Sequence, residues 1–202
     1  MISSDIPLHI QAEIIHDIRP QFCRQNRKDC SNLFSEIKGS FETIPNYFNS
    51  NFKYIENSKC NLTYKASWIE IEKNIWINDP ILNLINEKFP IDFCMIMKTE
   101  KNDIYDWHVD SERGVCINML LTNDHFSECI FYDEGEIFVL NYQPNKFYLF
   151  NSQILHKVKN NVADEQFGKK RYLFTVHFVD EKDKLDYDIA YNWMNQNNLI
   201  VK

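Results

Sequence analysis

The spacing of hydrophobic residues along the chain changes near residue 90. Before that point, apolar residues recur every three or four positions, most clearly from Ile6 to Ile18, and Pro20 is expected to end this segment. Residues from Ser31 to Ile37 follow a weaker form of the same pattern. The spacing therefore predicts that residues 1–90 are mostly helical.

Two features inside this region predict particular elements. The stretch from Trp68 to Glu72 alternates apolar and polar residues, which favours a strand. Asp79 followed by Pro80 is typical of a helix start, because an aspartate can cap the first turn and proline fits the first helical position. Apolar residues at helical spacing follow, and Pro90 marks the exit.

From residue 91 the apolar and aromatic runs are short, at strand length. They lie at residues 91–97, 115–121, 129–132, 136–142, 146–151 and 172–179. Turn-forming residues separate them, which favours an antiparallel sandwich or barrel. Residues 181–202 return to helical spacing, and Leu185, Ile189 and Trp193 lie on one face that we expect to dock on the sheet.

The chain is therefore predicted to be a single domain over residues 1–202, mainly β with flanking helices (α+β). Residues 1–90 would give helical support, residues 91–180 the β core and residues 181–202 a C-terminal helix. A length of 202 residues and a hydrophobic content of 44% suit a folded domain with a substantial core.

Charge and cysteine content narrow the class of protein. The formal net charge is -7, which argues against broad nucleic-acid binding. The N-terminus lacks the features of a signal peptide, and no apolar run approaches the length of a membrane span. The six cysteines show no CxxC pairing, so we expect reduced thiols in a cytoplasmic protein that does not act on membranes.

Candidate metal ligands stand in two places. In an extended segment, His108 and Asp110 would point to the same side, although such a pair can also be an ordinary polar turn. His156 follows a short aromatic strand further along the chain. Two histidines and one carboxylate form the facial triad that suits iron(II), and the same residue types accept manganese or cobalt.

Arg171 is a candidate anchor for an anionic ligand. It opens an apolar strand on which Arg171, Leu173, Thr175 and His177 would share one face. A buried arginine needs a carboxylate, which it binds through two parallel hydrogen bonds. A small dicarboxylate bound to the metal at its other end would supply that group.

These residues, in this order, resemble the iron(II)- and 2-oxoglutarate-dependent dioxygenases, in particular their prolyl-4-hydroxylase-like branch. The resemblance spans about residues 93 to 179. His108-Val109-Asp110 is similar to the proximal metal motif, and His156-Lys157-Val158 to the distal one. The segment from Arg113 to Asn118 resembles the strand that follows the first motif, and the segment from Arg171 to Phe178 the cosubstrate strand.

The resemblance implies a double-stranded β-helix, a distorted jelly roll with helices packed outside. It implies catalytic metal ligands at His108, Asp110 and His156, with Fe(II), 2-oxoglutarate and O2 as cofactors and cosubstrates. Arg171 would bind the far carboxylate of 2-oxoglutarate, with Asn118 and Tyr132 lining its pocket. The implied reaction hydroxylates a substrate and converts the cosubstrate to succinate and CO2.

Several positions depart from the family pattern. The interval from His156 to Arg171 is longer than usual, so Lys169 or Lys170 is an alternative anchor. His177 stands where the nucleic-acid-dealkylating branch has a second arginine, which counts against that branch. Asn145 takes a tight-turn position at which relatives often have glycine, and asparagine tolerates positive φ well.

Some roles stay open at this stage. Arg113 is read either as a contact for an acidic substrate or as a surface ion pair, and His177 either as a pocket residue or, preferably, as a core histidine. Asn118 and Tyr132 have structural alternatives, a plain buried hydrogen bond and a core side chain. The alternatives to an oxygenase are a cupin-like jelly-roll metal-binding protein without 2-oxoglutarate chemistry and a non-catalytic binding module. The expected substrate is a small molecule or a peptide side chain.

Overall fold

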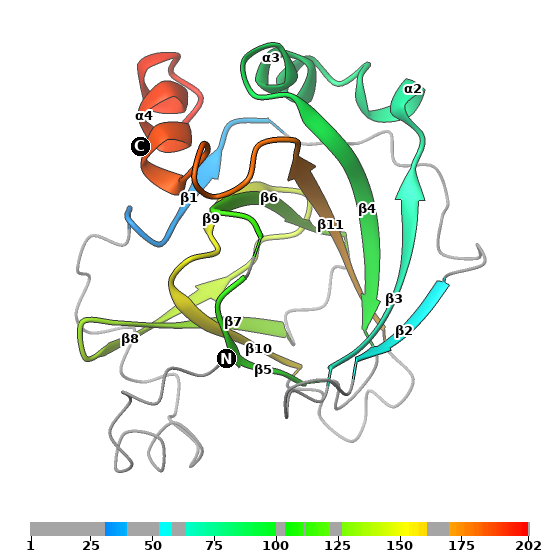
Figure 1. Ribbon diagram of the computed structural model, residues 1–202, viewed down its shortest axis with the longest axis vertical. Coiled ribbons are helices and arrows are strands. Elements are labelled where there is room, and N and C mark those ends of the chain that lie inside the picture. Colours follow the sequence, from blue (N-terminus) through cyan, green and yellow to red (C-terminus); the bar gives the residue numbers. More distant parts are fainter. Residues whose placement is uncertain are drawn as a thin grey trace.

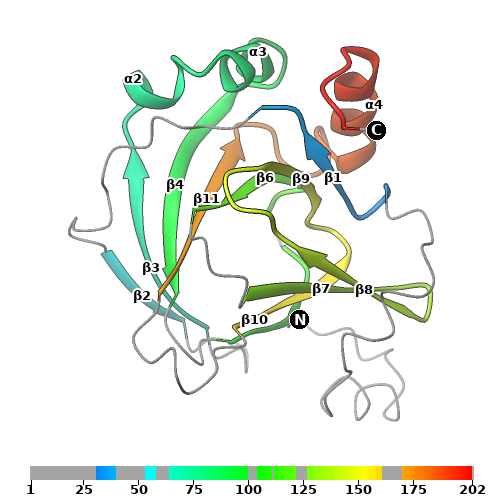
Figure 2. The ribbon, with the colours of Figure 1, turned by 180° about the vertical axis from the view of Figure 1, so that it is seen from behind.

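Two antiparallel β-sheets face each other in this computed structural model, which describes residues 31–39, 53–57, 64–99, 104–110, 112–121, 127–160 and 170–201 (Figure 1). The larger sheet has the strand order β1-β9-β6-β11-β4-β3-β2 and the smaller sheet the order β5-β10-β7-β8. The predicted mainly β jelly-roll class is confirmed. Figure 2 shows from behind how β7, β8 and β10 cross opposite the larger sheet.

The strands share a short length, as the sequence predicts. They are β1 (Phe34–Ile37), β2 (Lys53–Asn57), β3 (Tyr64–Ile71), β4 (Ile91–Thr99), β5 (Ile104–His108), β6 (Val115–Leu120), β7 (Ser127–Asp133), β8 (Glu136–Asn141), β9 (Phe147–Asn151), β10 (Leu155–Asn160) and β11 (Arg171–Phe178). The predicted strands from residue 91 onward are confirmed, and β5 and β10 join them.

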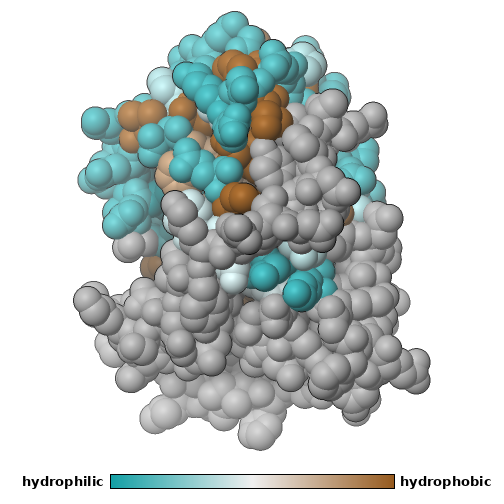
Figure 3. All heavy atoms as spheres, turned by 90° about the vertical axis from the view of Figure 1, so that its right-hand side faces the viewer, coloured by the Kyte–Doolittle hydropathy of each residue, from teal (hydrophilic) through white to brown (hydrophobic). Residues whose placement is uncertain are grey.

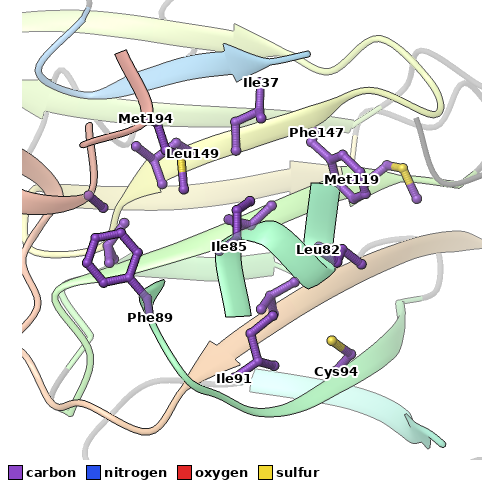
Figure 4. Packing of buried hydrophobic residues seen from close by; sticks show 14 of the residues in the cluster. Ile37, Leu82, Ile85, Phe89, Ile91, Cys94, Met119, Phe147, Leu149 and Met194 are labelled. Carbon is purple, nitrogen blue, oxygen red and sulfur yellow. The ribbon is translucent and has the colours of Figure 1, made fainter. Parts of the chain in front are cut away.

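Helices cover the outer face of the larger sheet. They are α2 (Lys73–Trp76), α3 (Pro80–Lys88) and α4 (Tyr187–Gln196). Leu82 and Ile85 of α3 lie among side chains from β4, β6 and β9, and Met194 of α4 joins the same core (Figure 4). Burial of these apolar side chains fixes the helices against the sheet, because about 25 cal/mol is gained for each Å² removed from water.

A second core fills the space between the two sheets. Cys116 and Leu120 of β6 face Cys129 and Phe131 of β7, and Leu173 of β11 joins them. Strand β6 is buried on both faces, which explains its continuous apolar sequence. Asn118 is the polar exception on that strand.

The helix start at residue 79 is confirmed. The Asp79 carboxylate accepts hydrogen bonds from the backbone amides of Ile81 and Leu82, and Pro80 occupies the first turn. The strand predicted around Trp68 is confirmed as part of β3. The tight turn at Asn145 has a φ of 61°, in the region that asparagine tolerates.

The prediction of a helix over Ser31–Ile37 is wrong. Residues Phe34–Ile37 form β1, which pairs with β9 so that Phe34 lies opposite Phe150. Pairing with β9 and burial of Ile37 outweigh a weak helical spacing. The described part of residues 1–90 contains three strands and two helices, so it is not mostly helical. The predicted helix Ile6–Ile18 lies outside the described residues.

The predicted contact face of the C-terminal helix is only partly correct: Trp193 packs against the core beside Phe89, but Ile189 does not. The helix begins at Tyr187, and Asp186 caps it by accepting a hydrogen bond from the amide of Ile189. Leu185 is buried but precedes the helix, and Ile189 is 47% exposed. The fully buried face is formed by Tyr187, Ala190 and Met194, which follow the i, i+3, i+7 spacing of one helix face, and Ile189 lies on the opposite side of the helix from them.

The described surface is mixed in polarity. In the coloured part of the face in Figure 3, hydrophobic atoms lie in small groups among hydrophilic ones. Among the described residues, no helix combines the length and the apolar character needed to cross a membrane.

Gly114 is expected to tolerate no side chain. A Cβ at this position would lie 2.6 Å from the backbone oxygen of Leu185 and 3.0 Å from Cα of Asp186. We expect Gly114→Ala to lower the free energy of unfolding by about 1–3 kcal/mol, measured by denaturant titration. Gly135→Asn is the comparison: nothing lies within 4 Å of an added Cβ there, although its φ of 84° strains a side chain, so we expect a smaller loss than in Gly114→Ala. Equal stability of Gly114→Ala and the unaltered protein would contradict this close packing.

Candidate metal centre

Strand pairing in the smaller sheet brings the two histidines together. His108 is the last residue of β5 and lies opposite His156 of β10, with ring centroids 4.3 Å apart. Asp110 follows just beyond the end of β5, where its amide donates a hydrogen bond to the Ser152 carbonyl at 2.9 Å. One ligand atom from each of His108, Asp110 and His156 lies within 4.8 Å of the others.

His156 is oriented for binding through its second ring nitrogen. Its side chain is buried, and Nδ1 lies 2.8 Å from the Ile154 carbonyl, which can only accept a hydrogen bond. Nδ1 therefore carries the proton, and Nε2 keeps a free lone pair. Burial, followed by the neighbouring His108, lowers the pKa of His156 to about 4, so the imidazole is neutral at pH 7. A neutral imidazole is the form that binds metal ions.

Asp110 supplies the negative charge of the group. Its Oδ2 lies 2.6 Å from Nε of Arg113, and its Oδ1 lies 3.8 Å from Nε2 of His108. Burial by itself raises the pKa of Asp110, but Arg113, His156 and His108 together lower it below its usual value. The carboxylate therefore stays ionised near neutral pH.

The turn before β10 fixes the segment that carries Asp110. Gln153 donates from Nε2 to the carbonyl oxygens of Asp110 and Arg113, each at 2.8 Å. The Ser152 hydroxyl donates to the Arg113 carbonyl at 2.8 Å. These side chains were not predicted from the sequence, because the residues they contact are about 40 positions away. They tie the loop after the first motif to the turn before the second.

Arg113 also contacts β11. Its NH1 lies 3.1 Å from Nε2 of His177, and the His177 ring stacks on Phe93 at a centroid distance of 4.4 Å. Burial, followed by Arg113, lowers the pKa of His177 to about 3. His177 is therefore a neutral, half-buried residue beside the centre and not a fully buried core histidine.

A buried polar cluster lies between the sheets. Arg171 is 3% exposed, and its Cζ lies 5.8 Å from the ring centre of Tyr142. Asn118 donates from Nδ2 to the Tyr142 hydroxyl at 3.3 Å, and Asn118 lies opposite Thr175 in the β6–β11 pair. Within the described residues, Asn118 Oδ1 and Thr175 Oγ1 are buried without a hydrogen-bond partner. We call Arg171, Tyr142, Asn118 and Thr175 the interior polar cluster.

Tyr132 is not part of this cluster. Alternation along β7 places Phe131 in the inter-sheet core and turns Tyr132 to the opposite face. Tyr142, just after β8, stands beside Arg171 instead. The sequence did not distinguish the two tyrosines, because each is an aromatic residue near the end of a predicted strand.

The ligand set fits a divalent metal ion. Two imidazole nitrogens and one carboxylate oxygen suit iron, manganese or cobalt, and three ligands on one side leave room for exogenous groups. The centre lies beside β11, whose inward face continues from His177 through Thr175 to Arg171. The roles of His108, Asp110, His156, Arg171 and Asn118 in binding remain predictions.

No family model and no curated protein matches the chain. Among solved structures, the non-heme alpha-ketoglutarate-dependent epimerase SnoN from nogalamycin biosynthesis matches with a TM-score of 0.50 and 7% identity, over 72% of this chain and 76% of that chain. A Pseudomonas putida prolyl-4-hydroxylase matches with a TM-score of 0.45 and 16% identity, over 62% and 76%. A cupin 2 conserved barrel domain protein from Rhodopseudomonas palustris matches with a TM-score of 0.41 and 8% identity, over 65% and 72%.

The likeness to SnoN concerns the fold. The chain resembles a 2-oxoglutarate-dependent non-heme enzyme in the arrangement of its sheets, in agreement with the resemblance seen in the sequence. Identities this low carry no information about substrate or reaction.

Proposed function

We propose that the protein is an iron(II)- and 2-oxoglutarate-dependent oxygenase that hydroxylates a small molecule or a peptide side chain, releasing succinate and CO2. The observation that carries this proposal is the convergence of His108, Asp110 and His156, whose ligand atoms lie within 4.8 Å of one another. His108 and Asp110 lie at and just beyond the end of β5 and His156 lies in β10, so the pairing of these two strands, and not sequence proximity alone, explains the grouping.

The metal fits this site for reasons of charge and geometry. Asp110 is ionised and His156 is neutral, which are the states that bind a divalent cation. Nδ1 of His156 donates to the Ile154 carbonyl, an outer contact of the kind that orients metal-binding histidines. Iron(II) with 2-oxoglutarate and O2, when bound, supplies the oxidising power for hydroxylation.

The interior polar cluster fits the cosubstrate. Arg171 presents a planar cation in the inter-sheet space, where a carboxylate can form two parallel hydrogen bonds with it. Thr175 Oγ1 is buried on the same side without a hydrogen-bond partner among the described residues, and its hydroxyl can donate to a carboxylate. A cupin-like metal-binding protein has no need for such a cluster.

The substrate class follows from charge more than from shape. A net charge of -7 disfavours a nucleic-acid substrate, and we propose a small molecule or peptide. In this scheme the chain's own residues keep Asp110 ionised, present Nε2 of His156 and bind the cosubstrate carboxylate at Arg171.

Anaerobic titration of the metal-free protein with iron(II) and then 2-oxoglutarate tests this function. We expect a weak visible charge-transfer band that requires both additions, and succinate release when O2 is admitted. A 2-oxo acid without a second carboxylate, such as pyruvate, is the control. It should produce the band only at much higher concentration than 2-oxoglutarate, because it lacks the carboxylate for Arg171. Iron binding without any band or succinate would favour the cupin-like alternative.

A further inference from the structure

We propose that Arg113 is a positioning residue of the metal centre, which restricts Asp110 to binding through one carboxylate oxygen. This inference rests on the proposed metal site, but it does not depend on the substrate or on 2-oxoglutarate. Arg113 was read from the sequence as a substrate contact or a surface ion pair; it does form an ion pair, but its partner is the partly buried candidate ligand Asp110.

The contact between Arg113 and Asp110 divides the two carboxylate oxygens. Nε of Arg113 donates to Oδ2 of Asp110 at 2.6 Å, a charge-assisted hydrogen bond. Oδ1 is the oxygen nearer to His108, at 3.8 Å from Nε2. One oxygen is thus used by the guanidinium and the other is directed toward the two histidines.

The guanidinium is fixed from its other side by β11. NH1 of Arg113 lies 3.1 Å from Nε2 of His177, and because arginine can only donate, Nε2 is the acceptor. His177 lies opposite Phe93 in the β11–β4 pair, and their rings stack with an interplanar angle of 13°. His177 therefore holds the guanidinium of Arg113 in the orientation in which Nε donates to Asp110.

The backbone around Arg113 is held as firmly as its side chain. The Arg113 carbonyl accepts hydrogen bonds from both Ser152 and Gln153. The Glu112 carbonyl accepts from the amide of Lys182 at 3.2 Å, and Gly114 packs against the backbone of Leu185. A residue anchored at both neighbours loses little further entropy when it orients a ligand.

The physical consequence concerns the number of open positions on the metal. A carboxylate with two free oxygens can chelate a cation, which would occupy one position more than a single oxygen does. With Oδ2 bound to Arg113, Asp110 fills one position, and the three protein ligands leave a full face for exogenous groups. Lysine could not replace this function well, because its point charge lacks the fork geometry.

Metal titration of the purified, metal-free full-length protein tests the proposal. We compare Arg113→Met and Arg113→Lys with the unaltered protein, using Mn(II) affinity by electron paramagnetic resonance and the visible spectrum of bound Co(II). We expect Mn(II) to bind about 10–100-fold more weakly in Arg113→Met and the Co(II) spectrum to change. Arg113→Lys should show the same changed Co(II) spectrum as Arg113→Met, because lysine restores the positive charge but not the fork geometry of the guanidinium.

A matched control separates orientation from loss of charge. Lys146→Met also removes one cation from an ion pair, with Glu36 at 3.5 Å, but it lies on another part of the molecule. We expect its Mn(II) affinity and Co(II) spectrum to equal those of the unaltered protein. His177→Phe should weaken Mn(II) binding in the unaltered background and add nothing in Arg113→Met, since His177 acts through Arg113.

The outcomes distinguish the two proposals. Unchanged Mn(II) affinity and Co(II) spectrum in Arg113→Met would overturn the role of Arg113 while leaving the metal site standing. Additive losses in the His177→Phe, Arg113→Met double variant would also overturn it, because they would make the two residues independent. Failure of the unaltered protein to bind any of these ions would reject the metal site itself. Should Arg113→Met fail to fold, Arg113→Lys and His177→Phe decide the question.

Discussion

Asp110→Asn is expected to abolish tight binding of divalent metal while leaving the protein folded. The amide has nearly the size of the carboxylate, but it has no charge and presents an NH2 group that cannot bind a cation. Asp110 is the one carboxylate in the group formed with His108 and His156. We therefore expect Mn(II) affinity to fall by more than about 100-fold, beyond the effect of losing an outer contact.

The rise in melting temperature caused by Mn(II) measures this effect. A ligand at about 100 times its Kd stabilises the native state by about 2.7 kcal/mol, so the unaltered protein should show a clear rise and Asp110→Asn none. The metal-free variant is also expected to melt somewhat lower, because Arg113 loses its ionised partner. For this reason the rise on adding metal is compared, and not the melting temperature itself.

Asp133→Asn serves as the matched control for this substitution. The Asp133 carboxylate accepts a hydrogen bond from Asn32 at 3.1 Å, on an exposed part of the molecule. It should keep the full metal-induced rise. A full rise in Asp110→Asn as well would show that this carboxylate is not a metal ligand.

The β core was predictable because its strands are short, apolar and separated by turn residues. Strand β6 illustrates this, since burial on both faces leaves a continuous apolar run that reads clearly. Strands β5 and β10 were not assigned, because four of the six residues of β10 are polar and its pairing partners β7 and β5 lie far away in the chain. Strand β1 was misassigned, because its strand state comes from pairing with β9.

The candidate site also has a part that could be predicted from the sequence and a part that could not. His108, Asp110, His156 and Arg171 were predicted because their residue types carry chemistry and stand in a characteristic order. Their supports could not be predicted, since a contact such as Gln153 to the Asp110 carbonyl is set by the packing of two loops. Tyr142 was not predicted beside Arg171, because the face that an aromatic side chain takes depends on strand register, where a shift of one residue turns it to the other face.

Arg171→Met is expected to weaken 2-oxoglutarate binding strongly and to leave metal binding intact. Methionine fills much of the space of the arginine stem, so the inter-sheet core stays packed. Loss of a buried charge-assisted contact costs about 3 kcal/mol, which corresponds to a roughly 100-fold weaker affinity. The measurement is isothermal titration of the anaerobic Mn(II)-loaded protein with 2-oxoglutarate, with Mn(II) affinity determined in parallel.

Lys170→Met is the control that decides between neighbouring cations. Lys170 is exposed and immediately precedes β11, whereas Arg171 is buried on the inward face of that strand. The same loss of one positive charge should leave 2-oxoglutarate affinity unchanged in Lys170→Met, because a solvated charge contributes little to a buried contact. If Lys170→Met instead weakened binding and Arg171→Met did not, the anchor would be the lysine, and the interior polar cluster would serve packing alone. Because Arg171 is not one of the three candidate metal ligands, a simultaneous loss of Mn(II) binding in Arg171→Met would indicate a disturbed fold and not a lost anchor.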